Sequence, residues 1–342
     1  MPRTQNRRGK IQILGSRSSG LVMRDENGPE VGWNGNGVVA EATVLIPDNI
    51  AQDLSVHAGS GQNQRRQVEG VPPNLSAEWR SIVSLIRKRL DGWPGFVIIT
   101  GFPIGPDHDV DYPRRLVWRF GQYLGQPVTQ DTLGTSIYEV VDTGASTEAG
   151  ARLSVTNKRT GFHTDNSFEK DVPRYVALYC VEAAESGGRS QLISAHTIVE
   201  RLCKIAPDVV ERLKLPVFFD RRGGIEHGEE PYASYPVIDS VEGRLVVRYL
   251  RYYIESGYAK AGQRMDVETR IALDTFDEAC AHPGLAADFS LSRGDMLIVD
   301  NYCVLHNRTQ FHDDRTRQRR LLRLWLRPHD EPGADSSAGV GH

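Results

Sequence analysis

Short apolar runs bounded by turn residues dominate the chain from residue 136 onward, and one earlier run has the same character. Runs of about four to eight apolar residues between Gly, Pro, Asn or Asp are typical of buried strands. We expect strands at Phe96–Ile99, Ile137–Val141, Arg174–Val181, Ser190–Ser194, Val217–Phe219, Leu245–Leu250, Met296–Val299, Tyr302–Leu305 and Arg319–Leu326.

Four other stretches are predicted to be helical. In the first, Ser76 is a plausible N-cap, and the apolar residues after it recur at the 3-, 4- and 7-residue spacing of an amphipathic helix: Trp79, Ile82, Val83, Ile86 and Leu90. The others are predicted at Pro113–Leu124, about 196–213 and 266–281. Many short strands with a few helices favour a β-barrel or β-sandwich with helical decoration, and jelly-roll sheets are one such solution.

The organised sequence fits one domain. Residues 1–74 are rich in polar residues and glycine with little periodicity, so we expect a partly irregular N-terminal arm. We expect a single domain over residues 75–328, because no internal repeat or convincing linker divides it. Residues 329–342 are predicted to form a flexible tail.

Composition and charge exclude several classes of protein. The 342 residues are 39% hydrophobic and 25% charged, as in an ordinary globular protein, and the formal net charge of −3 gives no electrostatic reason to expect nucleic-acid or membrane binding. No apolar run approaches the roughly 20 residues that span a bilayer, and no signal-peptide core follows the basic amino terminus. The cysteines fit small buried side chains in a reducing compartment: Cys180, Cys203, Cys280 and Cys303. We therefore expect a cytoplasmic location.

A His-x-Asp pair stands at His163 and Asp165. Side chains two residues apart in an extended segment point to the same side, so the pair can offer a nitrogen and an oxygen ligand to one ion. A third ligand would complete the 2-His-1-carboxylate facial triad, which leaves other positions of Fe(II) open to substrate and oxygen. On its own, such a pair is more often a polar surface turn than a metal site.

His306 is the candidate for the third ligand. It closes the expected strand Tyr302–Leu305, where a side chain is held rigidly. His312 is the nearest competitor, but it falls in a charged loop that we expect to be solvated.

Two arginines, Arg319 and Arg323, interrupt the last apolar run of the chain. A guanidinium inside an apolar strand is costly unless it has an anionic partner. The alternative is a surface strand with alternating charge, which the apolar residues around the pair make less favourable.

Together these motifs resemble the iron(II)/2-oxoglutarate dioxygenases of the taurine dioxygenase and clavaminate synthase-like group. The matching features are H-T-D at 163–165, G-G-R-S at 187–190, G-D-M-L-I-V-D-N-x4-H at 294–306 and R-x3-R at 319–323. The resemblance spans roughly residues 90–327 and implies a mainly β (α+β) fold. That fold is a double-stranded β-helix (jelly roll, cupin-like) with helical decoration and with its metal between the sheets.

For the metal, the resemblance implies that Fe(II) is held by His163, Asp165 and His306. The implied reaction uses O2 to decarboxylate 2-oxoglutarate to succinate and CO2 and oxidises a C–H bond of a small polar organic substrate, with hydroxylation as the expected outcome. Related halogenases have a small residue in place of the carboxylate, so Asp165 favours oxygenation over chlorination.

For the co-substrate, the resemblance assigns the distal carboxylate of 2-oxoglutarate to Arg323. A guanidinium fork matches a carboxylate in two parallel hydrogen bonds. Arg319, on the same face of the strand, would assist. Ser190 resembles the family's hydroxyl partner for this carboxylate, although the Gly187-Gly188 pair before it can equally be a tight turn.

Three functions stay open on the residues alone: a 2-oxoglutarate-dependent oxygenase, a zinc-dependent hydrolase on a similar barrel, and a catalytically silent binding module. The arginines expected to bind a dicarboxylate argue against the hydrolase, which has no need of them. The substrate is not readable from the sequence. The cationic segment Asn157–Arg159, with Arg248 and Arg251, points weakly toward a polar or anionic one, and solvated surface is the more common role of such residues. A place in natural-product biosynthesis and assembly into a homo-oligomer also stay open.

Overall fold

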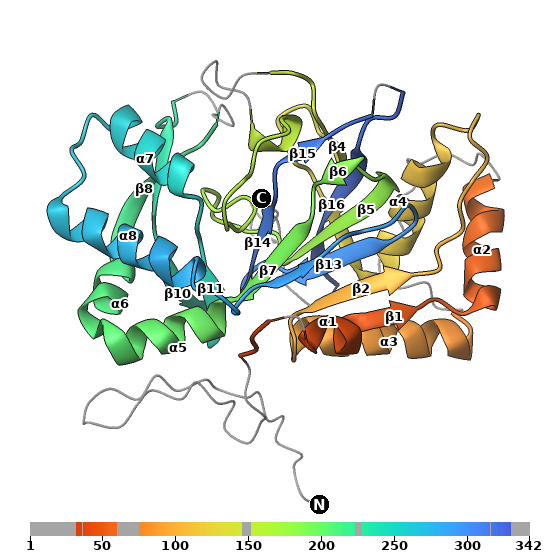
Figure 1. Cartoon of the computed structure of the whole chain (residues 1–342), viewed down its shortest axis with the longest axis horizontal. Helices are drawn as coiled ribbons and strands as arrows, with labels where there is room; N and C mark the ends of the chain where they lie inside the picture. Colours follow the sequence, from red (N-terminus) through yellow and green to blue (C-terminus); the bar gives the residue numbers. More distant parts are fainter. Residues whose placement is uncertain are drawn as a thin grey trace, which may run out of the picture.

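The computed structural model describes residues 32–35, 37–59, 75–145, 152–222, 228–314 and 316–329. Residues 1–31, 36 and 60–74 of the expected arm and the expected tail from residue 330 lie outside these ranges. The described chain folds into a double-stranded β-helix, with one group of helices against the larger sheet and a second group beside the smaller one (Figure 1). The expectation of a jelly roll is therefore confirmed.

The larger sheet has seven strands, in the order β1-β2-β13-β5-β16-β3 with β4 also paired to β16. All its pairings are antiparallel except that of β1 with β2. The strands are β1 (Thr43–Leu45), β2 (Phe96–Thr100), β3 (Gly125–Val128), β4 (Ile137–Val141), β5 (Tyr175–Glu182), β13 (Met296–Asp300) and β16 (Arg320–Pro328).

Both faces of this sheet are buried, which explains why its central strands are continuous apolar runs. In β13, Met296 and Ile298 join the cluster that packs against the helices, whereas Leu297 and Val299 join the cluster between the two sheets. Side chains alternate between the faces because the strand has a period of two. The covering helices are α2 (Asp48–Gly59), α3 (Ala77–Asp91) and α4 (Tyr112–Leu124) (Figure 1).

The smaller sheet holds the strand that carries His306. Its order is β12-β7-β14, with bounds Ala287–Phe289, Ser190–Ser194 and Val304–Arg308, and β6 (Ser186–Gly187) pairs separately with β15 (Phe311–His312). His306 pairs in register with Leu192 of β7, and on its other side it makes an isolated antiparallel bridge with His163. The H-T-D segment thus lies at the edge of the smaller sheet.

The remaining elements form a second hydrophobic cluster beside the smaller sheet, at the left of Figure 1. They include two hairpins, β8 with β9 and β10 with β11. The elements are α5 (Ala195–Ile205), α6 (Pro207–Leu213), β8 (Pro216–Asp220), β9 (Tyr232–Pro236), β10 (Ile238–Val241), β11 (Arg244–Val247), α7 (Arg251–Lys260) and α8 (Val267–Cys280).

Most elements expected from the hydrophobic pattern are confirmed within one or two residues. Helix α3 begins after Ser76, whose hydroxyl accepts a hydrogen bond from the Trp79 N–H at 3.2 Å, as the N-cap signal predicts. Strands β4 and β7 have the expected bounds. These are segments in which the apolar period and the turn residues agree.

Three of the expected elements differ from those in the structure. Strand β14 begins at Val304 and continues to Arg308, so His306 lies within the strand and does not close it. Strand β11 ends at Val247, and α7 begins only four residues later. The expected helical stretch 196–213 is two helices, because Pro207 begins the second and cannot continue the first.

The described part of the expected arm packs onto the domain. Helix α1 (Gly37–Ala42), β1 and α2 occupy residues 37–59, and buried residues of α2 such as Ile50 and Leu54 belong to the same cluster as those of α3. The division of the chain into arm, domain and tail stays a prediction.

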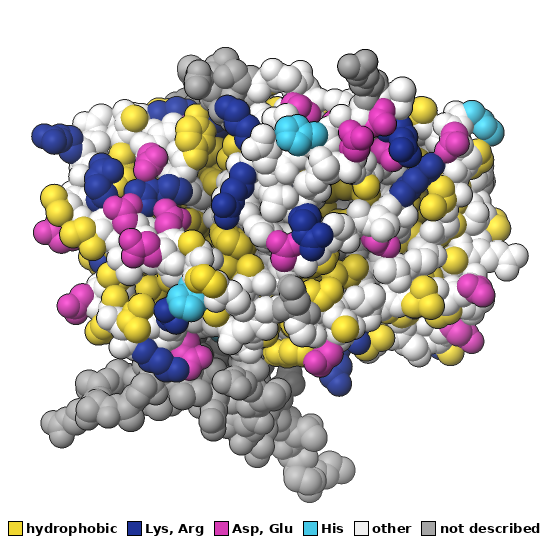
Figure 2. Space-filling view, in the orientation of Figure 1, with side chains coloured by type: hydrophobic (Ala, Val, Ile, Leu, Met, Phe, Trp, Pro, Cys, Tyr) yellow, Lys and Arg dark blue, Asp and Glu magenta, His cyan; other side chains and the backbone are white. Residues whose placement is uncertain are grey.

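The helices in the described part of the chain lack the features of a membrane span. None of the helices there has both the length and the apolar character needed to cross a bilayer. On the face in Figure 2, cationic and anionic side chains are interspersed.

Candidate functional site

Three side chains expected to bind metal meet between the two sheets. One ligand atom from each of His163, Asp165 and His306 lies within 4.8 Å of the other two. The Nε2 atoms of His163 and His306 lie 3.8 and 3.9 Å from Oδ1 of Asp165. Ligand atoms bound to one ion at about 2.1 Å lie roughly 3–4 Å apart, so this trio fits a single metal ion.

The tautomer of His163 also fits a metal ligand. Its Nδ1 lies 2.9 Å from the carbonyl oxygen of Gly161, which can only accept a hydrogen bond, so Nδ1 carries the proton. The Nε2 atom, on the side of Asp165, therefore keeps its lone pair. Such a backbone contact is the usual way of orienting a ligating imidazole.

Electrostatics favour the protonation states that bind a metal. Burial lowers the pKa of His163, and burial together with the neighbouring His163 ring lowers the pKa of His306 to about 3. Burial by itself would raise the pKa of Asp165, but the Arg323 guanidinium and the two histidines outweigh it and bring that pKa to about 2. At neutral pH the trio is two neutral imidazoles and one carboxylate, the forms that metal ions require.

Backbone hydrogen bonds hold the H-T-D segment in place. His163 and His306 exchange N–H···O bonds of 3.0 and 2.9 Å. Thr164 donates its N–H to the carbonyl of Tyr249 at 2.9 Å and its hydroxyl to the carbonyl of Val247 at 2.9 Å. The segment is thus paired with β14 on one side and with the end of β11 on the other.

The backbone of Asp165 is held by a side chain, that of Asn301. The Asn301 Oδ1 accepts the Asp165 N–H at 2.7 Å, and the Asn301 Nδ2 donates to the carbonyl of Asp165 at 2.9 Å and to that of Pro173 at 3.0 Å. Asn301 is 0% exposed, so all three bonds are shielded from water.

Two buried arginines hold the loops on either side of the H-T-D segment. Arg308, in β14, donates through Nη2 to three carbonyls of the upstream loop, residues 152–158: Leu153 at 3.4 Å, Thr156 at 2.6 Å and Lys158 at 2.5 Å. Arg248 donates to three carbonyls of the downstream loop, residues 167–170: Ser167 at 3.5 Å, Glu169 at 2.5 Å and Lys170 at 3.1 Å. Both loops are therefore fixed by guanidinium groups that come from other elements.

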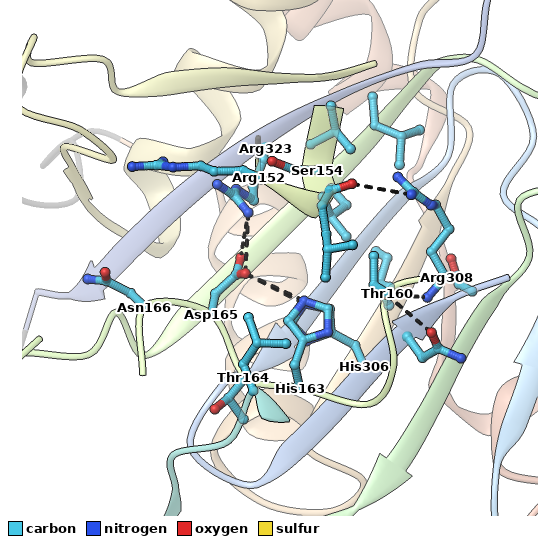
Figure 3. A pocket seen from close by; sticks show the side chains of 18 of the residues that line it. Arg152, Ser154, Thr160, His163, Thr164, Asp165, Asn166, His306, Arg308 and Arg323 are labelled. Carbon is cyan, nitrogen blue, oxygen red and sulfur yellow. Dashed lines mark hydrogen bonds and ion pairs between the residues drawn. The ribbon is translucent and has the colours of Figure 1, made fainter. Parts of the chain in front are cut away.

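Arg323 has its hydrogen-bonding partners within the protein. Its Nη1 lies 3.2 and 3.1 Å from the two carboxylate oxygens of Asp165 (Figure 3). Its Nε donates to Oε1 of Gln130 at 2.8 Å. The indole N–H of Trp325 donates to Oδ2 of Asp165 at 2.9 Å. The structure therefore brings Arg323 to the metal ligand Asp165.

Arg319 is in the opposite situation. It is 5% exposed, its Nη1 is buried without a hydrogen-bond partner, and it makes no ion pair among the described residues. Its guanidinium carbon lies 5.0 Å from the ring centre of Phe311, and that of Arg308 lies 4.9 Å from the same ring. A buried cation without an anionic partner is costly, which points to an anionic ligand at Arg319. Ser190, also buried, lines the same pocket.

One pocket contains the metal trio and both arginines of the R-x3-R motif, and much of its wall is apolar. The metal trio, Ser190 and both R-x3-R arginines line it. The apolar lining residues come from several parts of the fold: Val140, Leu153, Phe168, Leu178, Leu192, Leu250, Leu297, Leu321 and Trp325. Such a cavity excludes water around a few converging polar groups, as in most small-molecule sites.

The other candidates from the sequence lie elsewhere. His312 is exposed on β15 and does not belong to the metal trio, in keeping with the choice of His306. Lys158 and Arg159 are exposed and do not line the pocket, although Arg152 of the same loop does. Arg251 pairs with carboxylates of α7 and α8.

Arg248 was expected to be solvated surface and is buried, so that interpretation was wrong. Sequence reasoning also missed Asn301, Arg308 and Gln130. Asn301 is part of the G-D-M-L-I-V-D-N-x4-H motif, but its partner Asp165 is 136 residues away in sequence.

The chain is similar to known proteins over much of its length. The model of the family described as "Taurine catabolism dioxygenase TauD, TfdA family" matches residues 67–325. The FR-33289 synthase of Streptomyces rubellomurinus is 33% identical over 213 residues, which cover 60% of this chain and 61% of that protein. The uridine-5'-phosphate dioxygenase of a Streptomyces species is 31% identical over 170 residues, which cover 49% of this chain and 61% of that protein. The chain thus spans about three fifths of the length of both relatives.

Solved structures show the same fold. An asparagine oxygenase in complex with Fe(II), 2S,3S-3-hydroxyasparagine and succinate has a TM-score of 0.62 at 19% identity, covering 83% of this chain and 93% of that one. The non-heme iron oxygenase OrfP, in complex with (3S)-hydroxy-L-Arg, has a TM-score of 0.62 at 15% identity, with the same coverage of both chains.

Proposed function

Because the chain belongs to the TauD/TfdA dioxygenase family, we propose that it is an Fe(II)- and 2-oxoglutarate-dependent oxygenase acting on a small polar organic molecule. One observation carries the proposal: two neutral histidines and one carboxylate converge in a pocket that also holds a buried arginine without an anionic partner. A metal that binds and activates O2 needs the first feature. A dicarboxylate co-substrate needs the second.

His163, Asp165 and His306 would hold the iron, whose chemistry is the oxidative decarboxylation of 2-oxoglutarate to succinate and CO2 coupled to oxidation of a substrate C–H bond. The protein's own part is to keep the three ligands in place and to exclude water. Arg323 and Trp325 hold the carboxylate of Asp165 by hydrogen bonds. The apolar walls shield the reacting groups from solvent.

For the two arginines, we propose roles that differ from those implied by the resemblance. We propose that Arg319, with Ser190, binds the distal carboxylate of 2-oxoglutarate, because its guanidinium is buried and has no anionic partner among the described residues. Arg323 already donates to Asp165 and Gln130, so its proposed role is to orient and ionise the metal ligand. Arg308, close to Arg319 on the same ring of Phe311, adds positive potential there.

Hydroxylation is the proposed outcome of the reaction. A carboxylate at Asp165 occupies the position that chlorination would need for a halide, which supports oxygenation. A biosynthetic role is supported by the relative named as a synthase, and a polar substrate by the relative named for uridine-5'-phosphate. We further propose a cytoplasmic location, which the four unpaired cysteines support. The state of assembly stays open.

An oxygen-free titration tests the proposal. Purified protein with Fe(II) and 2-oxoglutarate should develop a weak visible charge-transfer band, and on admission of O2 it should form succinate. His163→Ala, Asp165→Ala and His306→Ala should each abolish both signals, whereas His312→Ala should keep both. Turnover supported by Zn(II) without oxygen would favour a hydrolase, and a band without succinate across a broad set of substrates would favour a silent binding module.

A further inference from the structure

The pocket around the metal ligands has an excess of positive charge. Asp165 is the single carboxylate among its described lining residues, against four arginines: Arg152, Arg308, Arg319 and Arg323. With both histidines neutral, the lining therefore has a formal charge of +3. Fe(II) and the 2-oxoglutarate dianion have opposite charges of equal size, so binding both leaves the excess unchanged. A largely apolar cavity with this charge attracts a further anion.

Among these arginines, Arg152 has no assigned role. Arg323 is paired with Asp165, Arg308 donates to the upstream loop, and Arg319 is the proposed partner of 2-oxoglutarate. Arg152 is half-buried and makes one hydrogen bond, from Nη1 to the carbonyl of Gln130 at 3.3 Å, and no ion pair among the residues that the structure describes. Its Nε and Nη2 atoms are thus available to a ligand.

Two neutral hydrogen-bonding residues, Tyr253 and Asn166, line the same pocket. Burial raises the pKa of Tyr253, and nearby guanidinium groups, including those of Arg152 and Arg323, oppose that rise without removing it, so the phenol is a proton donor at neutral pH. Asn166 directly follows Asp165 with φ of 56°, in the left-handed region. Such a backbone conformation in a residue that lines a pocket often marks a functional position. Figure 3 shows Asn166 on the Asp165 side of the site, away from Arg308 and Thr160.

We propose that Arg152, Tyr253 and Asn166 form the subsite for an anionic head group of the primary substrate, and that this head group is a doubly charged tetrahedral oxyanion, a phosphomonoester or a phosphonate. The two negative charges of such a group offset most of the +3 formal charge of the pocket lining, whereas a carboxylate or sulfonate offsets only one positive charge. A guanidinium fork with a phenol and an amide also matches the several acceptor oxygens of such a group. This inference rests on the proposed function, since it assumes that 2-oxoglutarate occupies Arg319.

The test uses anion probes on the full chain. Protein with Fe(II) and saturating 2-oxoglutarate is titrated without oxygen, by calorimetry, with inorganic phosphate, methylphosphonate, methanesulfonate and acetate. Phosphate and methylphosphonate should bind at least tenfold more tightly than the two monoanions. Arg152→Met should lower the affinity for phosphate and methylphosphonate at least tenfold. Arg152→Lys, which keeps the charge and loses the fork, should have an affinity between those of the wild type and Arg152→Met. Arg159→Met, an exposed arginine of the neighbouring sequence outside the pocket, is the matched control and should bind as the wild type does.

Each outcome decides the inference. Equal binding by wild type and Arg152→Met, or no anion binding by the wild type, overturns the subsite, and a preference for acetate or methanesulfonate overturns the dianion. The charge-transfer band of the wild type with 2-oxoglutarate is recorded first. Absence of that band refutes the proposed function itself, whereas a normal band with no dependence of phosphate binding on Arg152 refutes only the subsite.

Discussion

The side-chain amide of Asn301 pairs with both backbone groups of Asp165. Its Oδ1 accepts the N–H of Asp165 at 2.7 Å and its Nδ2 donates to the carbonyl at 2.9 Å. A strand neighbour would usually make these two bonds, but the H-T-D segment is an isolated bridge and has no such neighbour at this residue. Asn301 therefore fixes the backbone from which the carboxylate ligand projects.

Asn301→Ala is expected to weaken metal binding more than its effect on folding explains. The change leaves buried backbone groups of Asp165 unpaired, at about 1–3 kcal/mol each, and it frees the ligand to leave its position. Fe(II) affinity, measured by oxygen-free titration, should fall at least tenfold. Asn301→Asp keeps the acceptor for the Asp165 N–H but loses the two donated bonds, so it should be defective as well.

A destabilised control separates positioning from stability. Leu202, 0% exposed in α5, belongs to the second cluster and lies outside the pocket lining. Leu202→Ala should cost about 2–5 kcal/mol of unfolding free energy and leave Fe(II) affinity near that of the wild type. Equal losses of iron affinity in the two variants would show that Asn301 acts through general stability alone.

Arg308 and Arg248 should protect different peptide bonds from cleavage by trypsin. Arg308→Lys replaces a planar fork with a single ammonium that cannot reach all three carbonyls of the upstream loop. Cleavage after Lys158 and Arg159, both exposed, should then accelerate severalfold under native conditions. Arg248→Lys should instead accelerate cleavage after Lys170 in the downstream loop.

Each of these variants is the control for the other, because both remove one buried arginine. Fragments are identified by mass spectrometry during a time course. Acceleration at both loops in both variants would indicate global loosening, and no acceleration in either would show that the carbonyl contacts do not limit loop motion.

The parts of the site that the sequence predicts depend on short-range patterns. His163 and Asp165 share a face because a strand has a period of two, and ligand chemistry marks them. The expectation that His306 completes the trio rested on the apolar run before it, and the trio is found although that run begins later than expected.

What the sequence does not predict depends on partners far along the chain. The R-x3-R spacing places Arg319 and Arg323 on one face but cannot say which of them meets Asp165. That is decided by the packing of β16 against β4 and by Gln130, 193 residues before Arg323. Arg308 and Arg248 have backbone carbonyls as acceptors, which every residue offers, so no residue type marks their partners. Helix α7 was missed because its sequence, RYYIESGYAK, mixes aromatic and polar residues with a glycine.

Asp300 should make stability fall as pH rises. Burial raises its pKa to about 6, against an ordinary value of 3.8, although Arg174 lies 3.5 Å from its carboxylate. The folded chain therefore holds the proton more tightly than the unfolded chain does. Its contribution is fully present below about pH 4 and is lost as pH rises through about 6. The loss is on the order of 3 kcal/mol, at 1.36 kcal/mol per pKa unit.

Asp300→Asn removes this titration and keeps an oxygen for the Tyr302 N–H. Urea unfolding of wild type and variant from pH 4 to 8 should give free energies that diverge in favour of the variant, with the change centred between pH 4 and 6. A difference that does not depend on pH would mean that Asp300 is ionised in the fold throughout this range, through its contact with Arg174.

The last prediction distinguishes the role of Arg323, which lies in β16, from that of Arg319, which directly precedes this strand. If Arg319 binds the distal carboxylate of 2-oxoglutarate, Arg319→Met should weaken the binding of that co-substrate by about 2–5 kcal/mol. This corresponds to roughly 30-fold to several thousand-fold in affinity. Pyruvate has the same keto-acid end and no distal carboxylate, so its affinity should change much less. Arg323→Met should instead weaken both oxo acids and Fe(II) itself, because it leaves the buried Asp165 without its guanidinium partner.

Titrations of the charge-transfer band with both oxo acids decide between the assignments. A selective loss of 2-oxoglutarate over pyruvate in Arg323→Met, with Arg319→Met unaffected, would restore the roles expected from the motif and would mean that Arg323 leaves Asp165 when the co-substrate binds. Equal losses for both oxo acids in Arg319→Met would show damage to the iron site, and the proposed clamp at Arg319 would then be wrong. Selectivity in Arg319→Met alone is the expected result, since Arg319, unlike Arg323, is buried without an anionic partner among the described residues of the site.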